Sequence, residues 1–330
     1  MTAPTKPPLL AIKDLRVMFP GGLEAVSGVD LTVDRGEVLG IVGESGSGKS
    51  VSMLAAMGLL GPGVGVTGSV RLDGEELVGR PASMLRRLRG KRLAMIFQDP
   101  MTALNPVMTI GEQIGEAIRI HEPGVARRAL AARVVDLLAL VAIPFPRRRA
   151  EQYPHEFSGG MRQRAMIAMA MANDPELLIA DEPTTALDVT IQAQVIELLD
   201  RLRRERGMGL VLITHDLGIV AGLADRVAIM YSGRVVERAP VREAFYAPMH
   251  PYTRKLLASL PSIEGGAERL TPIEGIPPGL GDRPTGCPFH PRCDLVIERC
   301  LVERPALTGG AEHSAACHRA EAAVPAGGAL

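Results

Sequence analysis

The sequence predicts an α/β protein with a mostly parallel central sheet. Apolar runs typical of strands alternate with segments whose apolar residues recur at helical spacing, which is the pattern of β-α-β units. The run VLGIVG at 38–43 is apolar throughout, as expected of a strand that helices cover on both faces. The other predicted strands span residues 14–19, 29–33, 69–74, 93–97, 177–181, 210–214 and 226–231.

Composition excludes several classes of protein. The 330 residues include 37 basic and 37 acidic side chains, and 46% are apolar, so the chain can bury a large core and carries no net charge to attract a polyanion. Its longest apolar stretches, such as LLALVAI at 137–143, are far shorter than a membrane span requires. We therefore expect no transmembrane segment, and the short apolar run before Lys13 predicts no export signal.

The pattern changes twice along the chain. Residues 99–173 are mainly helical in pattern, which predicts a helical subdomain inserted into the sheet protein. Residues 240–330 hold 12 of the 26 prolines and all four cysteines, which is typical of a loop-rich segment. We therefore place a boundary near residue 245, with one domain over 1–245 and a small extension over 246–330.

A glycine-rich loop follows the predicted strand at 38–43. Its residues GESGSGKS match GxxxxGK(S/T) between a strand and a helical segment, which is the context that this phosphate-binding motif requires. Backbone N–H groups would surround the phosphates, Lys49 would reach the β- and γ-phosphates, and the Ser50 hydroxyl would ligate Mg²⁺. The alternative is an ordinary glycine-rich turn before Lys-Ser. The predicted ATP-binding residues here are Gly43, Ser45, Gly46, Gly48, Lys49, Ser50 and Val51.

An acidic pair follows another predicted strand. In LLIADEP at 177–183, four apolar residues precede Asp181 and Glu182, so both carboxylates are expected at the carboxyl edge of the sheet, where phosphates bind. Asp181 would hold Mg²⁺ through water, and Glu182 would polarise the water that attacks the γ-phosphate. The alternative, a solvated acidic pair at a strand end, loses weight because the phosphate loop is present in the same chain.

Four further residues accompany these motifs. FSGGMRQR at 157–164 places Ser158 before a helix start that could face an anion, although an ordinary helix cap is the alternative. Gln98 in IFQDP could join the shell of metal and water, and His215 in ITHD could contact the γ-phosphate. Asp188 lies in the segment ALD. Each alone could be a polar loop residue, and their order in the chain favours function.

The motifs GESGSGKS, FQDP, FSGGMRQR, LLIADEP, ALD and ITHD, in this order, resemble the ATPase subunit of an ATP-binding-cassette (ABC) transporter. The resemblance implies a RecA-like P-loop NTPase core, an antiparallel β subdomain and an inserted helical subdomain. It also implies a head-to-tail dimer with composite sites. Residues Ser158, Gly159, Gly160 and Asp188 would then contact ATP held by the partner ATPase. Phe19 falls where the family has an aromatic that stacks on adenine, with a core phenylalanine as the alternative.

Further segments resemble one subfamily, the ATP-binding subunits of oligopeptide and dipeptide importers. These segments are IFQDPMTALNP, YPHEFSGG, HPYT at 250–253 and GCPFHPRC at 286–293. The resemblance implies a complex of two integral-membrane permeases, two identical or different ATPases and an extracytoplasmic peptide-binding protein. The ATPase would be peripheral, at the cytoplasmic face of the inner membrane. Close relatives carry nickel or glutathione, so these substrates remain open.

The cysteines Cys287, Cys293, Cys300 and Cys317 have the spacing C-x5-C-x6-C-x16-C. Tight CxxC pairs, usual in zinc sites, are missing, whereas iron–sulfur clusters accept irregular spacing. The subfamily resemblance implies a 4Fe–4S cluster. His290 and His318 keep zinc open, and four buried thiols without metal are a third possibility.

Two other classes of protein are rivals. A non-transport ABC ATPase acting on DNA or ribosomes would be expected to carry a coiled-coil insertion or a second cassette, and the sequence has neither. A P-loop kinase would have no use for FSGG, ALD and ITHD. The basic runs at 85–92 and 146–150 lack interleaved aromatics, so we expect solvated or permease-facing surfaces and no nucleic-acid partner.

Overall fold

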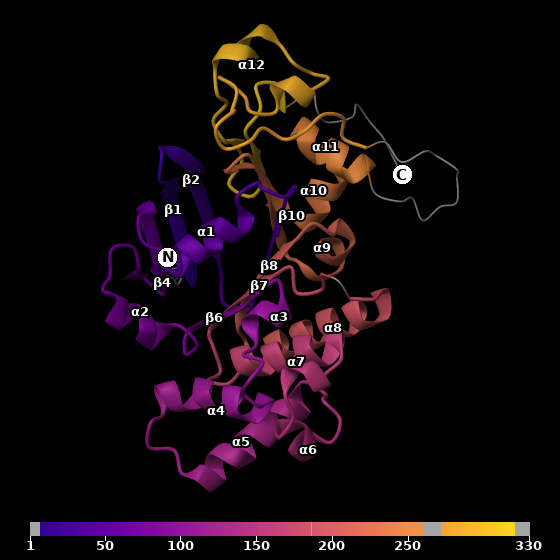
Figure 1. The fold of residues 1–330 in the computed structure, drawn as a ribbon. Helices are drawn as coiled ribbons and strands as arrows, with labels where there is room; N and C mark the ends of the chain where they lie inside the picture. The colour runs from indigo at the N-terminus through magenta and orange to yellow at the C-terminus, as the bar shows by residue number, and fades with distance from the viewer. Residues whose placement is uncertain (1–6, 186, 260–271, 321–330) are drawn as a thin grey trace, which may run out of the picture. The chain divides into compact units, whose positions relative to one another are not determined.

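The computed structural model describes residues 7–185, 187–259 and 272–320, which belong to two compact units (Figure 1). The first unit contains residues up to Leu10, Val33–Glu37 and Asp73–Ile213. The second contains Ala11–Thr32, Val38–Leu72 and residues from Thr214 onward.

The first unit contains a parallel sheet. Strand β7 (Leu177–Asp181) lies between β6 (Leu93–Ile96) and β8 (Gly209–Thr214), with both neighbours parallel to it. Every residue of β7 and β8 is buried, which explains their unbroken apolar sequences. These three strands confirm the predictions at 93–97, 177–181 and 210–214.

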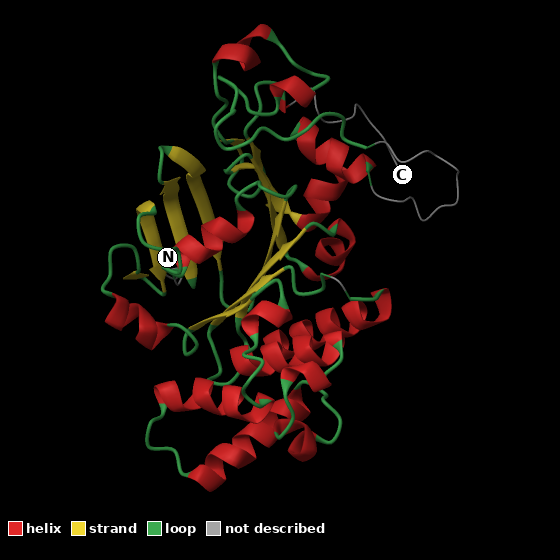
Figure 2. Cartoon of the chain, in the orientation of Figure 1, coloured by secondary structure: helices red, strands yellow, loops and turns green. Residues whose placement is uncertain are grey.

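Helices dominate the rest of the first unit, and Figure 2 shows that the segment between β6 and β7 is mainly helical. The predicted helical character of 99–173 is therefore confirmed. Apart from the short strand β5 (Glu75–Glu76), the remaining elements are α2 (Ala82–Leu88), α3 (Pro100–Ala103), α4 (Ile110–His121), α5 (Arg127–Leu140), α6 (Pro146–Ala150), η1 (Pro154–Glu156), α7 (Gly159–Ala170) and α8 (Val189–Arg206).

Helix α8 illustrates how sequence sets these elements. Asp188 caps its N-terminus by accepting a hydrogen bond from the backbone of Ile191, and Gly207 ends it in the left-handed conformation at φ 62°. Its apolar stripe is buried, while the arginines of its last turn complement the negative end of the helix dipole. The buried residues are Val195, Leu198, Leu199 and Leu202.

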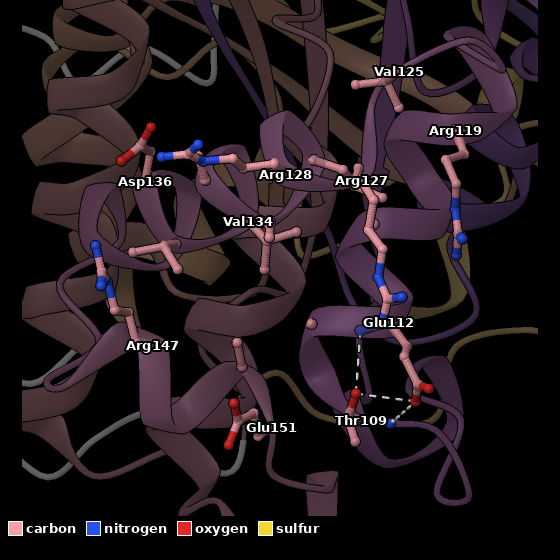
Figure 3. Close-up of a pocket in the computed structure, with 17 residues that line it drawn as sticks. Thr109, Glu112, Arg119, Val125, Arg127, Arg128, Val134, Asp136, Arg147 and Glu151 are labelled. Carbon is pink, nitrogen blue, oxygen red and sulfur yellow. Dashed lines mark hydrogen bonds between the residues drawn. The ribbon is translucent and has the colours of Figure 1, made fainter.

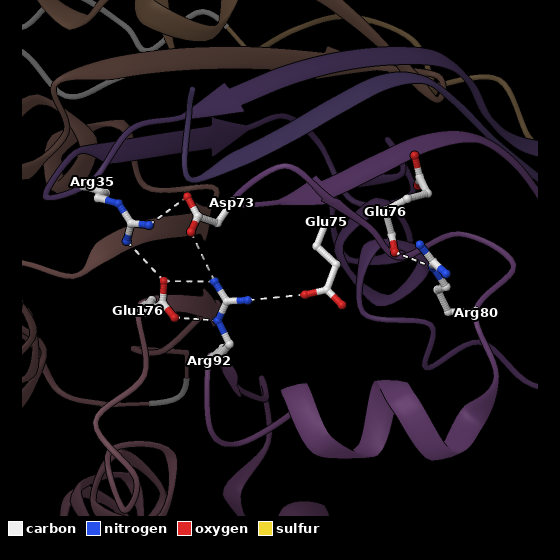
Figure 4. A network of polar contacts seen from close by, with 7 residues as sticks. All are labelled: Arg35, Asp73, Glu75, Glu76, Arg80, Arg92 and Glu176. Carbon is white, nitrogen blue, oxygen red and sulfur yellow. Dashed lines mark hydrogen bonds and ion pairs between the residues drawn. The ribbon is translucent and has the colours of Figure 1, made fainter. Parts of the chain in front are cut away.

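An ionic network joins five charged side chains of the first unit (Figure 4). Arg92 Nη2 lies 3.2 Å from Glu176 Oε2 and 3.5 Å from Asp73 Oδ2. Arg35 pairs with the same two carboxylates at 3.1 and 2.8 Å, and Glu75 adds a contact to Arg92 at 3.4 Å. The Arg92 guanidinium is the main cause that lowers the pKa of Glu176, with Arg35 adding to it.

The second unit carries strands of two sheets. Pro20–Gly22 connects β1 (Leu10–Phe19) to β2 (Leu23–Val33) so tightly that these paired strands must be antiparallel. Strand β4 (Gly65–Leu72) pairs with β1 on its other side. In the other sheet, β3 (Val38–Val42) runs parallel to β9 (Arg226–Tyr231), which pairs antiparallel with β10 (Arg234–Pro240). Short strands β12 (Ser314–Ala315) and β11 (Thr308–Gly309) follow β10 in order.

One core of the second unit continues across residue 245. Tyr231 of β9 packs against Tyr252 and Phe289, with ring centroids 4.7 and 5.3 Å away, and all three side chains are buried. Loops are the main component after residue 272, as expected (Figure 2). The helical elements of this unit are α1 (Lys49–Ala56), α9 (Leu217–Leu223), α10 (Val241–Tyr246), α11 (Pro251–Ala258), η2 (His290–Arg292) and α12 (Glu298–Val302). The domain limits themselves stay a prediction.

Candidate nucleotide-binding site

The GESGSGKS loop joins the buried strand β3 to helix α1. Gly48 caps α1 with φ 96°, and no side chain caps the first turn, so its backbone N–H groups face outward from the helix start. Lys49 Nζ donates to the carbonyl oxygens of Gly43 and Glu44 over 2.7 and 3.0 Å. The ammonium group is therefore held beside the loop, as the predicted role of Lys49 requires.

Close backbone packing surrounds this loop within the second unit. A Cβ on Gly43 would lie 2.1 Å from the carbonyl oxygen of Met230, so only glycine fits. Gly233, in the turn between β9 and β10, donates its N–H to Ser47 O over 2.9 Å. Ser47 is buried, and within the described residues its hydroxyl has no hydrogen-bond partner. A glycine-walled loop at a helix N-terminus fits a polyphosphate.

The other predicted residues of the second unit lie at strand or helix ends. Ser45 and Gly46 are exposed on the loop, and Val51 lies in the first turn of α1 with Ser50. Phe19 ends β1 and is half-buried, so it is not a core residue. His215 is exposed directly after β8. The contacts of these residues with adenine and phosphate stay predictions.

The acidic pair lies at the end of β7 in the first unit, as expected. Asp181 is buried at 5% exposure, and Glu182 adopts the left-handed backbone conformation at φ 45°. Glu182 Oε2 accepts hydrogen bonds from Gln98 Nε2 over 3.0 Å and from Thr185 Oγ1 over 2.8 Å. The structure therefore joins Gln98 and Glu182, two residues predicted separately to act in hydrolysis.

The predicted contacts to the partner's ATP lie at two neighbouring helix starts of the first unit. Ser158 Oγ accepts from the backbone N–H of Met161 over 3.4 Å at the start of α7. Asp188 caps α8, and a Cβ on Gly160 would lie 2.8 Å from Ile191 Cγ2 in the first turn of α8. A Cβ on Gly159 would lie 3.6 Å from Leu187 Cδ2, so the two helix starts are closely packed. The roles of these residues stay predictions.

Two known protein families match parts of the chain. The description "ABC transporter" matches residues 26–185, which include the phosphate loop, FSGG and the acidic pair. The description "Oligopeptide/dipeptide transporter, C-terminal region" matches residues 236–300. The second match begins in β10 and covers the first part of the extension, including the segments HPYT and GCPFHPRC.

Curated relatives decide the family. The oligopeptide transport ATP-binding protein OppD of Haemophilus influenzae is 49% identical over 304 residues, which are 91% of this chain and 94% of that protein. The chain belongs to the ABC ATP-binding proteins of peptide transport. OppD of Bacillus subtilis is 50% identical over 305 residues, covering 91% of this chain and 85% of the relative. OppD of Mycobacterium bovis is 51% identical over 95% of this chain, which spans about half (52%) of that relative's length.

Solved structures agree with this membership of the ABC family. The dimeric post-hydrolysis structure of the ATP-binding cassette MJ0796, bound to ADP and Pi, matches with a TM-score of 0.64 and 27% identity. The match covers 71% of this chain and 99% of that cassette. The ABC ATPase fold, an α/β P-loop fold with an antiparallel β subdomain, is therefore confirmed. No helix in the part of the chain that the structure describes is long and apolar enough to cross a membrane.

All four cysteines of this ABC protein line one cavity in the second unit. Cys287 and Cys300 are buried, Cys293 and Cys317 are half-buried, and none is in a disulfide. Burial, followed by the neighbouring thiols, raises the pKa of Cys287 to about 11. Within residues 7–185, 187–259 and 272–320, no three His, Cys, Asp or Glu side chains are spaced to hold a metal ion. Four thiols are the donor set of an iron–sulfur cluster. In this structure, however, the distances between them are not those of a metal site.

A large groove lies away from these motifs. A groove of about 1150 Å³ is lined by residues of α4, α5 and α6 in the first unit (Figure 3). Thr109 and Glu112 form a capping box at the start of α4, with Glu112 Oε2 accepting from the Thr109 N–H over 2.8 Å. Arginines and carboxylates both line the groove, and none of the predicted nucleotide residues does.

Three residues at the loop were missed by sequence reasoning. Glu44 of GESGSGKS contacts Arg292 and Tyr252, which belong to the segments GCPFHPRC and HPYT. Those segments had served only as marks of the peptide-importer subfamily. The polar and aromatic side chains of these two segments were the available signal, but nothing in the sequence pairs them with a loop more than two hundred residues away.

Proposed function

We propose that this chain is the ATP-hydrolysing subunit of an ABC importer that takes up dipeptides or oligopeptides. The observation that carries the proposal is the GESGSGKS loop, held between a buried strand and an uncapped helix start with its lysine on the loop carbonyls. Relatives matched over most of their length are named for oligopeptide transport, which supports the substrate class.

In this proposal the residues divide the reaction among them. The loop N–H groups and Lys49 bind the β- and γ-phosphates, and Phe19 stacks on adenine. Ser50, Gln98 and Asp181 hold Mg²⁺, which neutralises charge on the phosphates. Glu182 accepts a proton from the attacking water, and Gln98 orients its carboxylate through their hydrogen bond.

The hydrolytic site is completed by a second ATPase in this proposal. His215 contacts the γ-phosphate, and residues from the partner close the nucleotide from the other side. The dimer of the matched cassette MJ0796, bound to ADP and Pi, supports such an arrangement. The residues that this chain offers to its partner's ATP are Ser158, Gly159, Gly160 and Asp188.

Transport requires partners that cross the membrane. We infer two integral-membrane permeases, a second identical or different ATPase, and an extracytoplasmic peptide-binding protein reached through the permeases. The chain would lie peripherally at the cytoplasmic face of the inner membrane. We expect the permease to dock near Gln98 and the helical subdomain. The groove among α4, α5 and α6 of that subdomain offers charges of both signs (Figure 3).

Affinity purification of the tagged chain from its native membrane tests this assembly. Mass spectrometry of the retained proteins should find two polytopic permeases together with a peptide-binding protein. Recovery of permeases for nickel or glutathione would replace the substrate and retain the importer. Recovery of ribosomal or DNA-bound proteins without permeases would overturn the proposal in favour of a non-transport ABC ATPase.

The cysteine cavity supports a second, narrower proposal, that Cys287, Cys293, Cys300 and Cys317 ligate a 4Fe–4S cluster. Four thiols around one cavity are the donor set that such a cluster uses. Burial, and after it the neighbouring cysteines, raises the pKa of Cys287, Cys293 and Cys317, and a bound metal would compensate the charge of the buried thiolates. Iron and acid-labile sulfide in anaerobically purified protein would support the cluster. Stoichiometric zinc, with His290 or His318 as a ligand, or thiols without metal, would contradict it.

A further inference from the structure

Glu44 is the second residue of the phosphate loop, and the C-terminal extension holds it at two points. Arg292 Nη1 and Nη2 donate to its two carboxylate oxygens over 2.6 and 2.9 Å. Tyr252 Oη accepts from its backbone N–H over 2.9 Å. The parallel, two-bond contact with Arg292 fixes the direction of the carboxylate as well as its distance. All these residues belong to the second unit.

Arg292 is itself fixed from every side. Its remaining donors reach the carbonyl oxygens of Glu274 and Ile273 over 2.9 and 3.3 Å and the hydroxyl of Tyr231 over 3.3 Å. Its side chain is only 4% exposed. The carboxylate of Glu44 raises the pKa of Arg292, so the guanidinium keeps its charge. A planar fork with all its donors engaged is a rigid support, which a lysine ammonium cannot reproduce.

Hydrogen bonds also fix the segment that carries Tyr252. Glu237 of β10 is fully buried, and its carboxylate accepts from the backbone N–H of His250 over 2.9 Å and from Thr253 Oγ1 over 2.6 Å. His250 Nδ1 then accepts from the Tyr252 N–H over 3.0 Å. The start of α11 is thereby fixed on β10, and the Tyr252 hydroxyl is directed at the phosphate loop.

The two contacts converge on the lysine of the loop. Lys49 Nζ donates to the carbonyl oxygens of Gly43 and Glu44, so a rotation of the Glu44 peptide would move an acceptor of the ammonium group. Arg292 fixes the side chain of Glu44 and Tyr252 fixes its N–H.

We propose that Arg292 is a positioning residue for ATP binding, which sets the conformation of Glu44 and through it the place of Lys49. The proposal rests on the proposed nucleotide-binding function of the loop. It assigns a task to the extension that is independent of whatever the cysteines bind. Because the extension then acts on the nucleotide affinity of its own chain, loss of the contact should weaken ATP binding more than it slows turnover.

Titration of the full chain with a fluorescent ATP analogue and Mg²⁺ tests this inference. We expect Arg292→Ala and Glu44→Gln each to weaken binding about tenfold, because either change breaks a partly buried charged pair. Arg292→Lys should bind ATP nearly as weakly as Arg292→Ala, since the charge alone does not restore the two parallel hydrogen bonds. Arg299→Ala is the matched control, because Arg299 forms an exposed ion pair with Glu303 in the same extension and should bind like wild type.

A double variant separates positioning from general weakening. The single variant Arg292→Gln completes the cycle with Glu44→Gln. In the double variant Glu44→Gln with Arg292→Gln, affinity should be no lower than in the weaker-binding of these two single variants, because both changes remove one interaction. ATPase assays on the assembled transporter should find KM for ATP raised about tenfold and kcat within about twofold of wild type. Thermal unfolding of each variant identifies any that fail to fold, and the milder Glu44→Gln and Arg292→Lys variants then decide.

Two results would overturn the inference. One is wild-type affinity in folded Glu44→Gln and Arg292→Lys, and the other is a strictly additive loss in the double variant. Failure of the proposed function gives a different result, because wild type and Lys49→Ala would then bind the analogue equally poorly.

Discussion

Gln98 donates a hydrogen bond to Glu182 over 3.0 Å, although 84 positions separate these residues in the sequence. Thr185 donates to the same carboxylate oxygen over 2.8 Å. Glu182 therefore has a fixed carboxylate at the end of β7, and its backbone occupies a left-handed conformation that directs it away from the regular path of the strand. A general base needs such a fixed direction toward the attacking water.

Replacement of Glu182 by glutamine should abolish turnover and retain ATP binding. The amide keeps the shape of the side chain but cannot accept a proton from water, so steady-state hydrolysis should fall at least about 100-fold. Hydrolysis by the assembled transporter and binding of an ATP analogue are the two measurements. The control Glu205→Gln changes an exposed carboxylate on α8. Unchanged hydrolysis in Glu182→Gln would remove Glu182 as the base.

Two substitutions of Gln98 should differ in a defined order. Gln98→Ala removes one donor to Glu182, whereas Gln98→Glu places a second carboxylate beside it. We expect the alanine variant to lower kcat about tenfold and the glutamate variant to lower it further, because like charges would push the Glu182 side chain away. Equal rates in both variants would show that the hydrogen bond does not orient the base.

Gly43 should tolerate no side chain. A methyl group there would lie 2.1 Å from the backbone oxygen of Met230, and backbone cannot move aside as a flexible side chain can. Gly43→Ala should therefore displace the phosphate loop from β9 and reduce ATP binding more than about tenfold. Gly61→Ala is the control, since nothing lies within 4 Å of the added atom there. Calorimetric titration with ATP compares the two variants, and equal affinities would contradict the expectation.

Glu176 should make stability depend on acid pH. Arg92 and then Arg35 lower its pKa in the folded chain, so its contribution is present above its ordinary value of 4.5 and is lost as the pH falls below that value. Because the network is partly exposed, we expect Glu176→Gln to cost about 1 kcal/mol near neutral pH. Urea unfolding at several pH values should find the two proteins converging in acid. A difference in the free energy of unfolding that does not change with pH would indicate that the variant loses packing contacts and that the ion pairs contribute nothing.

The buried ring of Phe289 should contribute more to the free energy of unfolding than any surface contact of the extension. It is 1% exposed and packs against Tyr231 and Tyr252, both at 5.3 Å between centroids. Phe289→Ala should lower the free energy of unfolding by about 3–5 kcal/mol. Val302→Ala, at a site 79% exposed, should change it by less than about 0.5 kcal/mol. Thermal unfolding of the two variants checks this, and similar midpoints would contradict the packing argument.

The sequence predicted the strands that carry the chemistry better than those that support it. VLGIVG and LLIADEP predict their strands clearly, because every residue is apolar up to the phosphate loop in the first segment and up to Asp181 in the second. Strand β10 was not predicted, since VVERAP places the charged Glu237 in the middle of it. That carboxylate is buried because donors from His250, Thr253 and His313 surround it, and these come from distant parts of the chain.

The candidate site follows the same division. Motif order was enough to predict Gln98 and Glu182 as members of one site, and the structure joins them directly. The link between Glu44 and Arg292 spans 248 positions and uses residue types that occur throughout the sequence. No spacing rule connects such a pair, because loop closure over that distance depends on how the intervening core packs.

The aromatic cluster of Tyr231, Tyr252 and Phe289 also limits how this protein can be recombined with its relatives. An extension grafted from another chain at residue 245 would bring new rings against a β9 surface shaped for the old ones. A working chimera must therefore exchange the inward-facing residues of β9 and β10 together with everything after them. The transferable module begins at β9, within the ATPase sheet, and the visible change in composition near residue 245 lies inside it.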